Sequence, residues 1–310
     1  MRVFRSPKDE GFPVRPVVTV GNFDGVHLGH RSIFSAMRSI AEKKGSQSLV
    51  LSFRDHPRTV LYPERRLSVI TTMDERLAAI EACGIDAVLL VDFTRETAAM
   101  TASDFVERYI VDALGATDVV IGYDHAFGRN REGNIDFLMM LAERRGFSVT
   151  QVSPFLCDGH PVSSTRIREE IEEGDVVDAA RYMGRFYSVT GRVVEGLRRG
   201  RTLGFPTANV ALPDAAKVIP ADGVYATRIR LSDGSVRHSV TNIGSNPTFG
   251  DVPRTIETHI MDYSGDIYGS QVTLEFVGQV RGEMKFSSVD ELVIAIRSDI
   301  DAARLMLLSV

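Results

Sequence analysis

Residues 16–30 read PVVTVGNFDGVHLGH, which joins a short apolar run to a glycine-rich turn and then to the start of a helical pattern. The apolar run over 16–21 is typical of a buried β-strand. The apolar face of a predicted helix over 30–44 consists of Ile33, Phe34, Met37, Ile40 and Ala41. A strand that passes through a tight turn into a helix is the repeating unit of a parallel α/β sheet, so this stretch predicts the fold of the first part of the chain.

The same alternation of apolar runs and helical patterns continues to about residue 183. Further strands are predicted at 48–53, 86–92, 117–122 and 147–152, and further helices at 73–83, 103–114 and 135–145. Thr72 and Glu75 form a capping box before the helix 73–83. Ligands of parallel sheets bind where the strands end, so the chemistry is expected in the loops 21–30, 53–66, 122–134 and 153–164.

The pattern changes after about Gly184. The β-segments that follow are 186–195, 223–231, 236–243, 255–262 and 271–280, with turn residues and no long helix between them. They predict a small closed barrel. An amphipathic helix over 288–308 ends the chain, opened by a capping box from Ser288 to Glu291. We therefore predict two domains, an α/β parallel sheet domain over 1–183 and a β-barrel domain with a C-terminal helix over 184–310.

Length and composition agree with two globular domains and exclude several classes of protein. The chain has 310 residues, of which 44% are hydrophobic and 25% charged. Its net charge of −5 argues against non-specific binding to nucleic acid or to a membrane surface. Cys83 and Cys157 lack metal-ligand partners at short spacing and are expected to be reduced and partly buried. We expect a soluble cytoplasmic protein with small-molecule substrates, without a nucleic-acid or membrane partner; nothing in the sequence selects an oligomeric interface.

The loop 21–30 has the residues of a phosphate site, although the chain has no P-loop motif. Glycines 21, 25 and 29 permit tight turns and close approach to a ligand. His27 and His30 are three residues apart at the start of a helix, where free backbone N–H groups add further donors. Such a site suits a triphosphate under attack at its α-phosphorus. The alternatives are surface histidines or a zinc site, and the latter lacks a third ligand nearby.

The second candidate segment of this domain is PVSSTRIREEI, residues 161–171. Ser163 or Ser164 can cap the helix that follows, and Arg166 and Arg168 lie near its positive end. Taken alone, the segment is more typical of an ordinary capped helix with solvated arginines, which is a common arrangement.

The two segments together, G-x-F-D-G-x-H-x-G-H followed by S-S-T-x-I-R, resemble the nucleotidyltransferase superfamily and, in detail, the FMN adenylyltransferase module of bacterial bifunctional riboflavin kinase/FAD synthetases. The resemblance implies that His27, His30 and Arg168 are catalytic. It implies ATP contacts from Gly21, Asn22, Phe23, Asp24, Gly25, Ser163, Ser164 and Thr165. The loop GYDHAFGRNREGN, residues 122–134, resembles the flavin-side loop of that family and implies flavin contacts from Asp124, Phe127 and Gly128.

Two positions depart from the family pattern. In FRDHP, residues 53–57, Asp55 replaces the first proline of F-x-P-H-P, and in the flavin-side loop His125 replaces an aromatic residue. Both could change the affinity for FMN or the rigidity of a loop, and neither removes an expected phosphate contact.

The barrel half contains a second constellation, GRVVEGLRRGRTLGFPTANV, residues 191–210. Its RRGR offers guanidinium and backbone donors to phosphates. Thr207 and Asn209 alternate in an extended segment, so their oxygens share one side and suit Mg²⁺. The alternatives are a solvated basic turn and a turn into a strand.

Five ordered motifs of this half resemble the riboflavin kinase family: PTAN (206–209), PADGVY (220–225), NIGSNPTFG (242–250), TIETHIMDYSGDIYG (255–269) and RGEMKFSSVDEL (281–292). The resemblance implies a six-stranded barrel that binds ATP, Mg²⁺ and riboflavin. Thr207 and Asn209 would hold the metal, and Glu257 would be the general base. Gly204 and Pro206 would contact ATP, and Arg281 the flavin.

The resulting prediction is an enzyme that phosphorylates riboflavin to FMN and then transfers AMP from ATP to FMN, giving FAD. The first alternative is a riboflavin kinase with an inactive nucleotide-binding first module, suggested by Asp55 and His125. Two others are a flavin or nucleotide sensor without turnover and a nucleotidyltransferase for another substrate.

Overall fold

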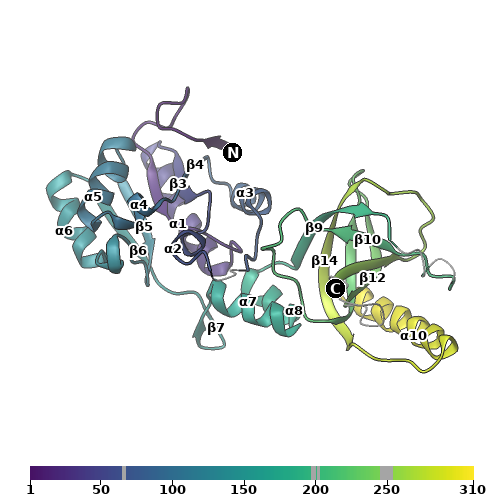
Figure 1. Cartoon of the computed structure of the whole chain (residues 1–310). Coiled ribbons are helices and arrows are strands. Elements are labelled where there is room, and N and C mark those ends of the chain that lie inside the picture. The colour runs from purple at the N-terminus through teal and green to yellow at the C-terminus, as the bar shows by residue number, and fades with distance from the viewer. Residues whose placement is uncertain (65–67, 197–199, 201–202, 245–253) are drawn as a thin grey trace. The chain divides into compact units, whose positions relative to one another are not determined.

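The computed structural model describes residues 1–64, 68–196, 200, 203–244 and 254–310, and these form two compact units, Met1–Ser164 and Thr165–Val310 (Figure 1). Two helices after the loops of the first unit, α7 (Ser164–Glu173) and α8 (Val176–Met183), therefore fall almost wholly in the second unit. The boundary at 183/184 between the two catalytic modules stays a prediction.

The first unit is built on a six-stranded, all-parallel sheet in the order β1-β4-β3-β2-β5-β6. The strands are β1 (Arg2–Phe4), β2 (Val17–Val20), β3 (Ser48–Phe53), β4 (Ala87–Val91), β5 (Asp118–Gly122) and β6 (Ser148–Val152). The five predicted strands are present. The sixth, β1, has three residues, too few to show a pattern in the sequence.

Helices connect these strands and cover both faces of the sheet. They are α1 (Leu28–Lys44), α2 (Pro57–Leu61), α3 (Met73–Ala82), α4 (Arg95–Ala99), α5 (Ala102–Phe105), the π-helix η1 (Val106–Ala113), the 3₁₀ turn η2 (Arg129–Arg131) and α6 (Ile135–Arg145). A small hairpin, β7 (Leu156–Cys157) with β8 (His160–Pro161), follows β6. The capping box of Thr72 and Glu75 at α3 is made in both directions. Neither Cys83 nor Cys157 forms a disulfide, and both are half-buried.

The predicted single helix over 103–114 is wrong in type, because one α-helical turn gives way there to a π-helix. Val106, Ile110 and Leu114 are buried at intervals of four residues, a spacing that fits either kind of helix. Hydrophobic spacing alone therefore does not separate the two.

Two apolar clusters make the core of this unit. On one face, sheet residues such as Leu49 and Leu89 pack against η1 and α6 through Ile110 and Leu138. On the other face, residues such as Val50 pack against α1 and α3. The sheet is thus buried on both sides, as expected for parallel strands.

The second unit contains a closed barrel in the order β10-β13-β12-β11-β14-β9. Its strands are β9 (Tyr187–Val194), β10 (Ala208–Ala211), β11 (Gly223–Arg230), β12 (Val236–Gly244), β13 (Thr255–Ile260) and β14 (Gln271–Gly282). Five correspond to the predicted β-segments. The sixth, β10, is the PTAN segment, and it makes the six-stranded barrel that the family resemblance implied.

The interior of the barrel includes a cluster of four fully buried hydroxyl groups. Thr227 Oγ1 lies 2.8 Å from the hydroxyls of both Ser239 and Thr241, and Thr241 Oγ1 donates to Thr258 Oγ1 at 3.0 Å. A hydroxyl can both donate and accept, so the four groups can bond to one another in a chain. Backbone carbonyls take part as well: Thr258 Oγ1 donates to the Val240 carbonyl at 3.5 Å. Residues that alternate with these, such as Glu257 on β13, lie on the outer face.

The terminal helix α10 (Val289–Leu308) packs along β11, β12 and β14 through Ala303 and Leu307 (Figure 1). Its predicted capping box is only half made. Ser288 accepts from the Glu291 N–H, but the Glu291 carboxylate binds the backbone and hydroxyl of Ser287 instead. Among the described residues, no helix is long and apolar enough to cross a membrane.

Candidate active sites

The strand order places two predicted site loops side by side. Strand β2 pairs with β3 on one side and with β5 on the other, so the order of the sheet reverses between β2 and β5. The loops that leave their carboxyl ends, 21–27 and 123–134, flank the crevice where sheets of this kind bind ligands.

His27 and His30 lie together where the first of these loops enters α1. His27 is the N-cap of α1, and its Nδ1 accepts a hydrogen bond from the His30 backbone N–H at 3.4 Å. The two imidazoles stack with centroids 3.6 Å apart. Because Nδ1 of His27 is an acceptor, the proton of the neutral ring lies on Nε2. The structure therefore brings both predicted histidines to one point beside the helix N-terminus.

The backbone of this loop is strained at several positions. Phe23 and Val26 have φ values of 54° and 40°, which L-residues rarely adopt, and Gly25 has a φ of 82°. The ring of Phe23 covers Gly21, where an added Cβ would lie 2.9 Å from the ring atom Cζ. The Phe23 ring also packs edge-to-face with the His30 ring, with the two ring centroids 5.1 Å apart. Such strain persists only where neighbouring contacts hold it.

Asp24 supplies several of those contacts. Its buried carboxylate accepts hydrogen bonds from the backbone N–H groups of Ile70 and Thr71 at 3.0 and 2.9 Å and from the Thr71 hydroxyl. Its backbone carbonyl accepts from the Ser164 hydroxyl at 2.8 Å. Asp24 thus anchors the loop, and its contact with ATP stays a prediction.

The segment 161–171 forms the start of α7. Ser163 precedes the helix, which begins at Ser164, and Thr165 is exposed at its first turn. Arg166 donates from Nε to Glu170 at 3.4 Å, while Arg168 is half-buried. The nucleotide contacts predicted for Ser163, Ser164, Thr165 and Arg168 stay predictions.

The loop after β5 is fixed around Phe127. Its backbone exchanges two hydrogen bonds with Gly133, at 3.1 and 2.9 Å, and its ring packs near Phe105 and Phe137. Gly128 has a φ of 73°, and an added Cβ would lie 2.6 Å from the Ala102 backbone nitrogen. Asp124 is exposed at the loop's start.

His125, one of the two departures from the family pattern, stacks on Phe127 with centroids 5.7 Å apart. Burial lowers the pKa of His125 to about 4, and Arg131 adds to this effect while Asp124 opposes it. The half-buried ring is therefore uncharged at neutral pH, and it presents an aromatic face where the family has an aromatic residue.

The other departure, Asp55, is exposed in the bend after β3. The next residue, His56, caps α2 by accepting from the Arg58 N–H at 3.1 Å, and Pro57 occupies the first turn. The His-Pro pair thus starts a helix although the first proline is missing.

In the barrel, Asn209 and Glu257 lie directly opposite each other on β10 and β13, and Asn242 lies opposite Glu257 on β12. Facing residues of neighbouring antiparallel strands have Cβ atoms about 5 Å apart. Thr207 Oγ1 donates to Glu257 Oε2 at 3.4 Å. The structure therefore brings the predicted metal ligands and the predicted base to one outer face of the barrel.

The segment before β10 folds closely around this face. The carbonyl of Pro206 lies 2.9 Å from His259 Nδ1, and Gly204 has a φ of 88°. An added Cβ at Gly196 would lie 2.1 Å from the Asn209 amide nitrogen, so that side chain packs against the glycine. Three arginines of RRGR, at 198, 199 and 201, and residues 245–250 of NIGSNPTFG lie outside the described residues.

Arg281 is bound to the terminal helix. Its Nε and Nη2 donate to the two carboxylate oxygens of Asp299, each at 2.8 Å, and its guanidinium lies over Phe286. The pair fixes α10 to β14, and the flavin contact of Arg281 stays a prediction.

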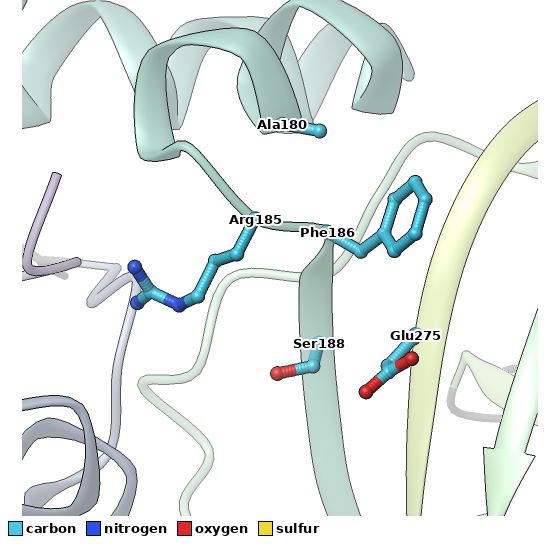
Figure 2. Close-up of a pocket in the computed structure, with 5 residues that line it drawn as sticks. All are labelled: Ala180, Arg185, Phe186, Ser188 and Glu275. Atoms are coloured by element: carbon cyan, nitrogen blue, oxygen red, sulfur yellow. The ribbon is translucent and has the colours of Figure 1, made fainter. Parts of the chain in front are cut away.

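The second unit has a cavity of about 360 Å³. It is lined by Ala180, Arg185, Phe186, Ser188 and Glu275, which Figure 2 shows. Ser188 is the second residue of β9, whereas Val194 at the other end of that strand faces Asn209. At about 3.3 Å per residue, Ser188 and Val194 lie about 20 Å apart. The cavity is thus separate from the outer face with Glu257, and it contains none of the predicted site residues.

Sequence reasoning missed two residues next to these sites. Arg76 of α3 is buried and donates a hydrogen bond to Asn22. Asn242 lies directly opposite Glu257 on the neighbouring strand. Asn242 belongs to a quoted motif and alternates with buried residues of β12, which could have identified it. Arg76 offered no signal, because its partners come from distant parts of the chain.

Comparisons with known proteins match a family model to each half of the chain. The FAD synthetase family model matches residues 11–166, and the riboflavin kinase family model matches residues 183–307. Proteins named bifunctional riboflavin kinase/FMN adenylyltransferase from Haemophilus influenzae and Pseudomonas fluorescens are 36% and 37% identical, each over 93% of this chain and 92% of the relative.

A solved structure from Streptococcus pneumoniae, described as a macrolide-efflux protein, has a TM-score of 0.89 and is 32% identical over 97% of this chain and 98% of that one. It shows that the whole architecture recurs in a known structure. Two family models in the predicted order, with relatives aligned along nearly the full length, lead to one conclusion: the chain belongs to the bifunctional riboflavin kinase/FMN adenylyltransferase family.

Proposed function

We propose that the chain phosphorylates riboflavin to FMN with ATP and then transfers AMP from a second ATP to FMN, giving FAD and pyrophosphate. The observation that carries this proposal is that one chain has both constellations, each assembled by its own unit: the stacked His27 and His30, and the row of Asn209 and Glu257. Family membership supports riboflavin, FMN, FAD and ATP as its small-molecule substrates and products.

In the adenylyl transfer, an oxygen of the FMN phosphate attacks the α-phosphorus of ATP, and the bond to pyrophosphate breaks. The attacking group is already anionic, so no base is required. The work of the protein is to stabilise charge on the phosphoryl oxygens. His27 Nε2–H, His30 and the N–H groups at the start of α1 are donors for this purpose. Arg168 and the serines at the start of α7 would complete the phosphate contacts.

In the phosphorylation, the 5′-hydroxyl oxygen of riboflavin attacks the γ-phosphorus of ATP, and its proton passes to a carboxylate oxygen of Glu257. The bond between the γ-phosphorus and the oxygen that bridges it to the β-phosphorus breaks, so that ADP leaves. Glu257 is half-buried on the outer face and within hydrogen-bond distance of Thr207, which can hold it in orientation. The oxygens of Thr207 and Asn209 are hard donors of the kind that suits Mg²⁺. Bound there, Mg²⁺ would neutralise part of the phosphate charge.

The direct test is to incubate purified protein with riboflavin, ATP and Mg²⁺ and to follow the flavins by chromatography. We expect FMN to appear first and FAD after it. FMN without FAD would favour the alternative, a kinase with an inactive first module, and no product would exclude both. The cytoplasmic location and the requirement for Mg²⁺ stay proposals, which cell fractionation and chelation would test.

A further inference from the structure

Arg76 of α3 connects the loop after β2 with the end of β3 at the proposed adenylyltransferase site. Its Nη1 donates to the Asn22 backbone carbonyl at 2.9 Å and to Asn22 Oδ1 at 2.6 Å. Its Nη2 donates to the Phe53 carbonyl at 2.7 Å. Asn22 belongs to the loop after β2, and Phe53 ends β3, so one guanidinium holds the exits of two adjacent strands.

The chemistry of the two side chains fixes the orientation of Asn22. A guanidinium has only donors, so it must face the carboxamide oxygen and not the NH₂ group. The Nδ2 hydrogens therefore point away from Arg76. No partner for Nδ2 occurs among the residues that the structure describes, and Asn22 lies one residue from Phe23, which packs on the His30 ring.

We propose that Arg76 is a positioning residue for adenylyl transfer: by holding Asn22 Oδ1, it presents the Nδ2 hydrogens of Asn22 to a phosphate oxygen of ATP. This inference rests on the proposed function of the first unit. Arg76 itself does not touch the substrate; it acts through Asn22.

The setting of Arg76 agrees with this role. The side chain is 5% exposed, and burial lowers its pKa while the charge of Asp24 opposes that shift. A buried guanidinium is costly unless its donors are used. Three hydrogen bonds of Arg76 go to Asn22 and Phe53, and Nη2 also donates to Met73 Sδ at 3.3 Å, whereas the buried Nε has no partner among the described residues. The bonds that are made all come from the two Nη atoms, two of them to Asn22, as a positioning role requires.

The test measures kcat/KM for ATP in FAD formation from supplied FMN, with riboflavin phosphorylation by the same protein as internal control. Arg76→Lys keeps the positive charge but cannot donate to Asn22 and Phe53 from two nitrogen atoms at once. We expect its kcat/KM for ATP to fall by about 10- to 100-fold, the range for one hydrogen bond to a charged group. The kcat/KM of Asn22→Ala should fall by a similar factor. Arg76→Lys in the Asn22→Ala background should cause less than a threefold further loss. Arg38→Lys, which alters an exposed arginine that donates to the Cys83 carbonyl at 3.3 Å, is the matched control and should keep full activity.

Asn22→Asp keeps an acceptor for Arg76 but removes the donor, so it tests the same idea in a protein that retains the anchoring contact. We expect at least a tenfold loss of FAD formation and unchanged phosphorylation. Equal losses from Arg76→Lys in both backgrounds would overturn the proposal, as would wild-type FAD formation by Asn22→Asp. A reduced melting temperature with normal kcat/KM per folded molecule would also overturn it. If the wild-type protein makes no FAD at all, the proposed function fails first.

Discussion

The stacked imidazoles of His27 and His30 lie where a negatively charged group would meet the N-terminus of α1. Replacing His30 by alanine removes a donor at this point while leaving the second unit untouched. We therefore expect FAD formation to fall by about 10²–10³-fold, as for other donors to a developing anion, and FMN formation to change less than twofold. Chromatography of both products checks this. His160→Ala, at an exposed histidine of the same unit, is the control. Equal loss of both activities would show that the assignment of His30 to one reaction is wrong.

His125 makes a prediction about pH. Its pKa is lowered to about 4 in the folded protein, against about 6.5 in an unfolded chain. Between these values the unfolded chain binds more protons, so the contribution of His125 to stability is complete above pH 6.5 and is lost as the pH falls towards 4. In His125→Phe the ring keeps its stack on Phe127 and cannot be protonated. Urea midpoints at pH 7.5 and pH 5 should differ less in this variant than in the wild-type protein. An unchanged difference would mean that His125 is protonated as easily as in the unfolded chain.

At the scale of elements, the loop after β5 depends on one glycine. Gly128 has a φ of 73°, and a Cβ added to it would lie 2.6 Å from the backbone nitrogen of Ala102. Gly128→Ala should lower the free energy of unfolding by about 2–5 kcal/mol, because left-handed strain and overpacking add, and it should reduce FMN adenylylation more than riboflavin phosphorylation. Gly146→Ala is the matched control: its φ is 76°, but the space around it is open, so only the cost of about 1–2 kcal/mol for the left-handed backbone applies. Similar losses at both glycines in urea unfolding would contradict the contact with Ala102.

How far the sequence predicts these elements depends on where each signal lies. Five of the six strands of the parallel sheet are continuous apolar runs and were predicted, whereas β1 was not. Both bonds at Thr72 and Glu75 were predicted because a capping box is local. The short helices α2 and α4 were missed, since five residues show no period. The Glu291 carboxylate accepts from Ser287 and not from the Ser288 N–H, because two neighbouring serines offer it competing donors.

The same distinction applies to the sites. His27 and His30 are three residues apart, so their meeting could be predicted. Alternation along the PTAN segment likewise predicted that Thr207 and Asn209 share one side. The pairing of Asn209 with Glu257 was not predictable from spacing alone, because it depends on the register of two strands about 50 residues apart. Arg76 and Asn22 meet for the same tertiary reason, through residues 54 positions apart.

For the whole molecule, the two sites imply separable activities joined by a diffusible product. His30→Ala should release FMN without FAD, and Glu257→Ala should adenylylate supplied FMN but not phosphorylate riboflavin. Mixed in equal amounts with riboflavin and ATP, the two variants should restore FAD formation, because FMN from one molecule can enter the other. FAD appearance by chromatography checks this. A mixture that makes FMN but no FAD would show that the intermediate must pass within one chain.

The hydroxyl cluster inside the barrel has a consequence for how reliably the second unit folds. Thr258 points inward to this cluster and its neighbour Glu257 points outward, so a shift of β13 by a single residue would exchange them. The misaligned form would leave Thr227, Ser239 and Thr241 facing a buried carboxylate, at a cost of several kcal/mol. The cluster therefore favours the correct register of β13 when the barrel closes. Because the shifted register is less stable, folded molecules in which Glu257 points inward should not accumulate.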